Sequence, residues 1–327
     1  MLTSERERYL GDILTTNGKI DQNIIARCNK GTGKVNEILS MLQEISFGPH
    51  YFKMALLFRN SILLSSMLCS SEVLYGLNKS HIEQLEQVDR IFFRRLFQVP
   101  DCTAVEAFYL ETSATPIRFL LMGRRLLYLW DILQKSESEL VKQVFNSQKL
   151  FTVKNDWVLQ VQLDLSDCGI DKNENEIARM KRNSFKKLVC EKIYLLSAQY
   201  LTGLKERHSK SEHLKYSQEM QLYLRSESLN IEGKKLLFKL RNRLIDVKTN
   251  FKKKYNNNLE CRLCSAPEES QSHLVQCSEI ICDNEVKEAL DGFQYSDIFS
   301  PNATIQEHLV NTWKKIIKIR NLKLKQI

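Results

Sequence analysis

Apolar residues along this chain recur mostly at steps of three and four, the spacing that places side chains on one face of an α-helix. The clearest helix is predicted from His81 to about Gln98, with apolar positions at Ile82, Leu85, Val88, Phe92, Leu96 and Val99. Ser80 followed by Glu83 predicts a capping box at its start. The same spacing predicts helices over about 24–42, 51–69, 104–110, 116–134, 176–200, 217–225, 233–244 and 304–320. We therefore expect a mainly α protein, a helical bundle.

One segment departs from this pattern. Residues 9–21, YLGDILTTNGKID, bring apolar Leu10, Ile13 and Leu14 up to Asn17-Gly18. Asn-Gly is a strong signal for a two-residue turn between strands. The segment predicts a short N-terminal β-hairpin.

The charge is unevenly spread over the 327 residues. The formal net charge is +9, yet residues 178–258 alone hold 20 Lys/Arg and 7 Asp/Glu. A local excess of this size is typical of a surface that binds a polyanion. The alternative is a set of solvated helix faces.

Four cysteines and a histidine stand out near the C-terminus. Cys261 and Cys264 form a Cys-x2-Cys pair, and His273 and Cys277 follow as His-x3-Cys. Three thiolates and one imidazole make the closed tetrahedral set that a structural zinc ion prefers. The spacing predicts one zinc ion in a small knuckle, with Cys282 as an alternative fourth ligand.

Breaks in the helical pattern divide the chain. Residues 135–175 are richer in Ser, Asp and Asn, which favours a connector with one short helix. The expected parts are a hairpin at 1–22, a helical domain at 23–150, a connector at 151–176, a basic helical domain at 177–258, a zinc knuckle at 259–282, and a C-terminal helix with a basic tail at 283–327.

The remaining composition points to an intracellular protein, nuclear or cytoplasmic. The first ten residues, MLTSERERYL, carry no apolar stretch of the kind found in a signal peptide. No run of about 20 apolar residues occurs, so we expect no membrane span. No adjacent Asp-Asp and no Gly-rich phosphate loop is present, and we expect no small-molecule substrate.

Several short motifs together resemble the C-terminal region of non-LTR (LINE-type) retrotransposon reverse transcriptases. Their order along the chain is Tyr9-Leu10-Gly11, Asn17-Gly18, Ile25-Ala26-Arg27, Leu74-Tyr75-Gly76, Leu85–Arg90, Arg94-Arg95-Leu96, and the cluster with Glu269-Ser270 and His273-Leu274. The resemblance implies that residues 1–22 are a remnant of the palm hairpin and that residues 23–150 are thumb-like. The catalytic aspartates of that family have no counterpart in this sequence, so no polymerase activity is expected of this chain alone.

The expected function is binding of RNA, DNA or an RNA–DNA hybrid through phosphates. The cations expected to make these contacts lead directly into the knuckle: Lys234, Lys235, Arg241, Arg243, Lys248, Lys252, Lys253 and Lys254. A second interpretation is a zinc-stapled helical scaffold that binds other proteins. A third, an active polymerase, would require a second chain that carries the palm aspartates.

Overall fold

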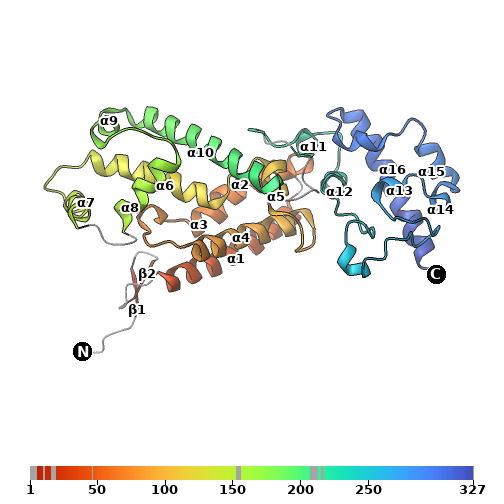
Figure 1. Ribbon diagram of the computed structural model, residues 1–327, viewed down its shortest axis with the longest axis horizontal. Helices are drawn as coiled ribbons and strands as arrows, with labels where there is room; N and C mark the ends of the chain where they lie inside the picture. Colours follow the sequence, from red (N-terminus) through yellow and green to blue (C-terminus); the bar gives the residue numbers. More distant parts are fainter. Residues whose placement is uncertain are drawn as a thin grey trace. The chain divides into compact units, whose positions relative to one another are not determined.

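The computed structural model describes residues 6–9, 12–15, 20–45, 47–151, 156–206, 213–214 and 217–326. The predicted mainly helical fold is confirmed (Figure 1). The chain divides into two compact units, and the division falls inside helices α2 (Tyr51–Phe58) and α4 (Lys79–Phe97). Unit 1 comprises residues 1–44, 55–93 and 114–207, and unit 2 comprises residues 45–54, 94–113 and 208–327.

The two N-terminal strands pair at a different place from the predicted hairpin. β1 (Arg6–Tyr9) runs antiparallel to β2 (Asp12–Thr15), with Tyr9 opposite Asp12. Both strands therefore precede the predicted turn at Asn17-Gly18, which lies outside the described residues. The expected hairpin over 9–21 is not supported, because Tyr9 and Asp12 leave only two residues between the strands.

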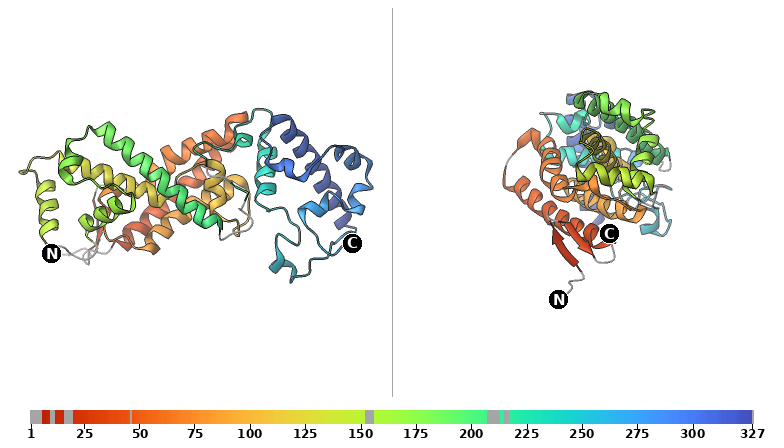
Figure 2. Two further views of the ribbon diagram at one scale, coloured as in Figure 1. Left: turned by 45° about the horizontal axis from the view of Figure 1, so that its top comes forward. Right: turned by 90° about the vertical axis from the view of Figure 1, so that its left-hand side faces the viewer.

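Unit 1 is built from helices that surround α6 and α10, which lie side by side in Figures 1 and 2. Its helical segments are α1 (Asp21–Glu44), a π-helical stretch η2 (Arg59–Leu64), α3 (Ser65–Met67), η3 (Ser71–Val73), α6 (Ile117–Leu133), α7 (Leu140–Leu150), α8 (Trp157–Asp167), α9 (Glu174–Arg179) and α10 (Arg182–Glu206).

The segment predicted as a connector, residues 151–176, packs within unit 1. Helix α8 occupies much of it, and Trp157 and Val161 lie in the same buried cluster as Phe145 of α7. The buried ion pair of Arg125 with Asp164 holds α8 against α6 at 2.7 Å. The outer faces of α7 and α8 are polar. The apolar residues of these helices therefore do not form a clear helical pattern in the sequence.

The start of helix α4 also differs from its predicted cap. The backbone N–H of His81 donates to Asn78 Oδ1 at 2.9 Å, and the helix already begins at Lys79. Asn78 therefore does the capping that the sequence assigned to Ser80. Asn and Ser have nearly equal preference for this position, so local pattern alone does not choose between them.

Unit 2 contains η1 (Gly48–His50), α5 (Val105–Thr112), α11 (Leu222–Arg225), α12 (Ile231–Arg241), η5 (Lys252–Tyr255), α13 (Gln271–Leu274), α14 (Ser278–Ile281), α15 (Asn284–Ala289), η6 (Tyr295–Phe299) and α16 (Ala303–Leu324). Its core brings distant segments together. Phe238 of α12 stacks on Phe97 with ring centroids 3.9 Å apart, and Phe97 stacks on Phe52 at 5.0 Å. Stacked rings bury a large apolar area and hold α12 against the segments that carry Phe97 and Phe52.

Within the part of the chain that the structure describes, none of the helices has the length and hydropathy needed to cross a bilayer.

Candidate functional site

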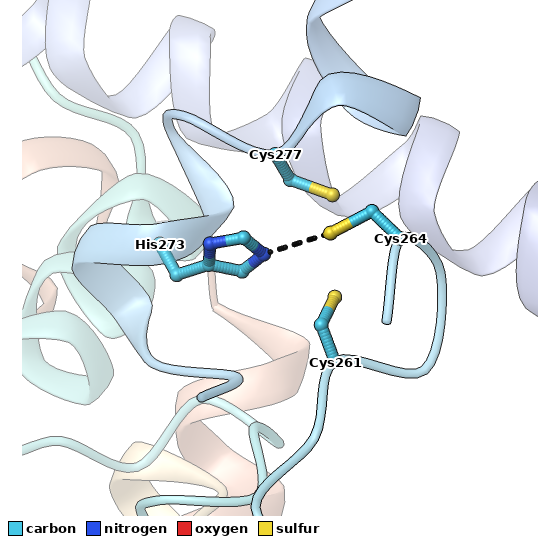
Figure 3. A group of neighbouring side chains, drawn as sticks. All are labelled: Cys261, Cys264, His273 and Cys277. Carbon is cyan, nitrogen blue, oxygen red and sulfur yellow. Dashed lines mark hydrogen bonds between the residues drawn. The ribbon is translucent and has the colours of Figure 1, made fainter. Parts of the chain in front are cut away.

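The four predicted metal ligands come together. The ligand atoms of Cys261, Cys264, His273 and Cys277 all lie within 4.8 Å of one another. Figure 3 shows the three thiols and the imidazole converging on one point, with Cys264 Sγ 3.3 Å from His273 Nε2. In a tetrahedron with Zn–S bonds near 2.3 Å the sulfurs lie about 3.8 Å apart. The donor types and their separations fit one metal ion, and this Cys3His cluster could hold it.

Short, locally determined turns position the ligands. The backbone N–H of Cys261 donates to Ala266 O at 2.7 Å, and that of Ser265 donates to Cys261 O at 3.1 Å, which closes the loop around the Cys-x2-Cys pair. Ser270 caps α13 by accepting from the His273 backbone N–H at 3.0 Å. His273 belongs to α13 and Cys277 directly precedes α14, so the two ligands lie on different helices.

The thiols of the cluster shift the pKa values of one another. Burial, together with the neighbouring Cys264 and Cys261 sulfurs, raises the pKa of the Cys277 thiol to about 12. Burial also raises the pKa of Cys264, but the hydrogen bond from the Ala266 backbone and those from Cys261 and Cys277 outweigh it, and the pKa is lowered. A dication between the sulfurs would remove the mutual repulsion of the thiolates.

Cys277, and not Cys282, completes the cluster. Cys277 is fully buried, whereas Cys282 is exposed. The Cys282 thiol instead donates to Glu279 O at 3.2 Å and accepts from Lys323 Nζ at 3.3 Å. The alternative ligand set is therefore not the one that the fold assembles.

A buried carboxylate ties the knuckle to the rest of unit 2. Glu269 is 1% exposed and accepts from both Arg262 and Arg320, at 2.8 and 2.7 Å. Both guanidiniums also donate to the backbone carbonyl of Asp246, Arg262 at 2.9 Å. Arg262 stands between the two cysteines of the Cys-x2-Cys pair and Arg320 is on α16. This triad, Glu269 with Arg262 and Arg320, therefore fixes the ligand loop on the C-terminal helix.

Four of the cations predicted to contact phosphate are buried in the interior of unit 2. Lys234 is fully buried and donates to Pro49 O at 2.7 Å, and burial lowers its pKa to about 8. Arg241 pairs with the buried Glu111 at 2.9 Å. Lys235 pairs with Glu232, and Lys248 is 8% exposed. Lys234, Lys235, Arg241 and Lys248 are therefore structural in this fold, a correction to the predicted contact set.

The other four predicted cations line one cavity. Lys252, Lys253 and Lys254 form the exposed turn η5, and Arg243 follows the end of α12. Together with residues 268 and 270–272 of the knuckle and with Tyr295, they surround a space of about 660 Å³. We call this space the basic cavity. Four cationic side chains and one carboxylate, Glu268, line it, so its net charge is positive.

The knuckle and the lysine turn are directly linked. Arg262 donates to the Tyr255 hydroxyl at 2.8 Å, and that hydroxyl donates to Asp246 Oδ1 at 2.8 Å. Lys254 pairs with the same carboxylate at 2.9 Å. No local signal in the sequence joins Arg262, Tyr255, Asp246 and Arg320 in one network, because Arg320 and Asp246 are 74 residues apart.

Comparison of the chain with protein-family models, with curated proteins and with solved structures finds no match. The functional assignment consequently depends on the cluster and the cavity themselves.

Proposed function

We propose that this chain binds nucleic acid through the phosphate backbone, at the surface formed by Arg243 and the Lys252–Lys254 turn. The observation that carries the proposal is the gathering of these four cations around one cavity beside the Cys3His cluster. Exposed lysine and arginine side chains supply most of the affinity of proteins for phosphate backbones. The proposal narrows the predicted contact set to the cations that are accessible.

The ion in the cluster is proposed to be zinc, in a structural role. Three thiolates and an imidazole leave no open coordination position, and soft sulfur donors favour zinc over magnesium or calcium. Because Arg262 lies within the ligand loop and donates to Tyr255, the metal would hold the lysine turn in its position. Metal binding in such a small knuckle is coupled to its local folding.

The resemblance to the C-terminal region of LINE-type reverse transcriptases is compatible with this proposal and stays a hypothesis about origin. RNA, DNA and RNA–DNA hybrid are all included as partners, because phosphate contacts carry no information about sequence.

The decisive experiment is a binding titration of the zinc-loaded chain against RNA, DNA and hybrid at several salt concentrations. With about four phosphate contacts, the logarithm of affinity for single strands should fall with log salt at a slope of about −3. Replacement of Lys252, Lys253 and Lys254 by Ala should weaken binding of every sequence alike and flatten that slope.

A matched control variant loses three lysines that lie in the other unit. Lys181, Lys186 and Lys187 are exposed lysines of unit 1 within the same basic segment of the sequence. Their replacement by Ala should leave the affinity and the salt slope nearly unchanged. Equal effects of the two triple variants, or wild-type protein without salt-dependent binding, would refute the proposal.

One observation favours a second candidate function, a zinc-stabilised scaffold for other proteins. Helix α7 and the residue after it expose Leu140, Leu150 and Phe151 at 75, 78 and 74%. Exposed apolar side chains gathered on one element are typical of contact sites. Specific capture of a partner protein that Leu150→Ser abolishes, without any binding of nucleic acid, would make the scaffold the leading interpretation.

A further inference from the structure

The basic cavity has the size of a pocket that binds one small ligand. It is not a flat charged surface. Its volume of about 660 Å³ falls within the range of cavities that enclose small ligands, roughly 300–1,000 Å³. A duplex presents its phosphates on a convex surface and its bases inside the stack, so it cannot place a nucleotide in such a space without unpairing it. A single strand can do so freely.

The lining provides both kinds of contact that a nucleotide needs. Arg243, Lys252 and Lys253 supply positive charge for a phosphate, and the aromatic residues Phe251 and Tyr295 line the same space. Bases stack on aromatic side chains with little regard to sequence, and single-strand binding proteins combine such rings with a basic groove. Cationic side chains alone would bind any polyanion. Aromatic residues beside them favour a nucleic acid with unpaired bases.

The backbone at Arg243 adopts a conformation that ends helix α12. Arg243 has φ of 52°, in the left-handed region that usually takes glycine. The backbone N–H of Arg243 donates to Leu240 O and that of Leu244 donates to Lys239 O, the two hydrogen bonds of a Schellman motif at the end of α12. The motif ends α12 at Arg243 and so fixes the backbone from which this side chain lines the cavity.

The hydroxyl of Tyr295, which also lines the cavity, is hydrogen-bonded to a buried side chain. Tyr295 accepts a hydrogen bond from Gln271 at 3.0 Å, and Gln271 in turn accepts from Asn250 at 2.9 Å. Gln271 belongs to α13, which also carries the metal ligand His273. The Tyr295 ring is therefore held against the knuckle by buried amides, which keeps a stacking platform in place before any ligand arrives.

We infer that the basic cavity seats one nucleotide of a single-stranded nucleic acid, with its phosphate on Arg243 and the lysine turn and its base on Tyr295. This inference rests on the proposed nucleic-acid binding and specifies its form. It predicts a preference for single strands over duplexes, which phosphate contacts alone would not produce.

The first test compares two substitutions at one position in the zinc-loaded full chain. Affinity is measured for an oligothymidylate or oligouridylate strand and for a duplex of the same length. Tyr295→Leu should weaken single-strand binding about tenfold, the loss expected for one stacked base. Tyr295→Phe keeps the ring but loses the hydrogen bond from Gln271, so it should weaken single-strand binding less than Tyr295→Leu does, and neither change should alter duplex binding.

The second test needs no variant at this site. Cys102 is exposed and lines the basic cavity, whereas Cys69 and Cys190 are exposed in unit 1. Alkylation by iodoacetamide, followed cysteine by cysteine by mass spectrometry, should slow about tenfold at Cys102 when the strand is present at about ten times its Kd. Cys69 and Cys190 should react at unchanged rates.

The two proposals fail in different ways. Salt-dependent binding that treats single strands and duplexes alike, with Cys102 unprotected, overturns the nucleotide site and leaves phosphate binding intact. Absence of salt-dependent binding to any nucleic acid overturns both. Single-strand preference with protection of Cys102 and loss on Tyr295→Leu supports the inference.

Discussion

Arg320 of the C-terminal helix donates to Glu269 of the knuckle at 2.7 Å, across 51 residues of sequence. Both side chains are almost fully buried, at 5% and 1% exposed. A buried carboxylate is tolerated only where charge and hydrogen bonds replace water, and Arg262 and Arg320 do so here. The contact makes the knuckle part of unit 2, and the first two predictions follow from it.

Removal of the Glu269 charge should destabilise the protein strongly. Glu269→Gln leaves Arg320 buried beside a neutral amide, so the free energy of unfolding should fall by about 3 kcal/mol. Glu268→Gln, the adjacent exposed residue, is the control and should change stability by less than about 0.5 kcal/mol. Urea denaturation of both variants in the presence of zinc measures the effect. Equal stabilities of the two variants would show that the triad contributes nothing.

The stability contributed by Glu269 should depend on pH in a defined direction. Burial raises the pKa of Glu269, but the hydrogen bonds from Arg262 and Arg320 outweigh it and hold the pKa below its ordinary value of 4.5. The unfolded chain then binds the proton more tightly, so the contribution is complete above about pH 4.5 and is lost as pH falls through the folded pKa. The difference in unfolding free energy between wild type and Glu269→Gln should therefore shrink with falling pH.

The Cys3His cluster should determine metal content. Metal analysis of the purified protein should find one zinc ion per chain, and Cys261→Ser should abolish or strongly reduce it. Cys282→Ser is the matched control, since Cys282 lies outside the cluster, and its zinc content should stay at one. Removal of zinc by a chelator should unfold the knuckle locally, which hydrogen exchange at residues 259–277 would report. Zinc retained by Cys261→Ser, or lost from Cys282→Ser, would contradict this assignment.

Arg243→Gly should raise stability while it lowers affinity for nucleic acid. Glycine adopts φ of 52° without strain, so the unfolding free energy should rise by about 0.5–1 kcal/mol. Loss of the guanidinium should weaken single-strand binding and make its salt slope shallower by up to about one unit. Gln98 provides the control, because it has φ of 54° at the end of α4 and does not line the basic cavity. Gln98→Gly should stabilise the protein similarly and leave binding unchanged.

Much of this protein was determined by the sequence itself, wherever the decisive contacts are local. The apolar spacing of three and four specified helices such as α4 and α16, because helical contacts span only one turn. The ligands Cys261, Cys264 and His273 were recognisable from spacing, because short turns bring them together. The location of the basic excess was also determined, since it depends only on composition.

Only the tertiary structure decided which residues are accessible. Lys234 and Lys252 look alike in the sequence, yet Lys234 is buried against Pro49, 185 residues away, while Lys252 is exposed. The choice of Cys277 over Cys282 and the pairing of Glu269 with Arg320 likewise depend on how α16 packs on the knuckle. Burial is a sum over neighbours that are distant in sequence, so no local pattern contains it. For this reason the sequence indicated eight cations as phosphate contacts, whereas the fold buries four of them and places the other four around one cavity.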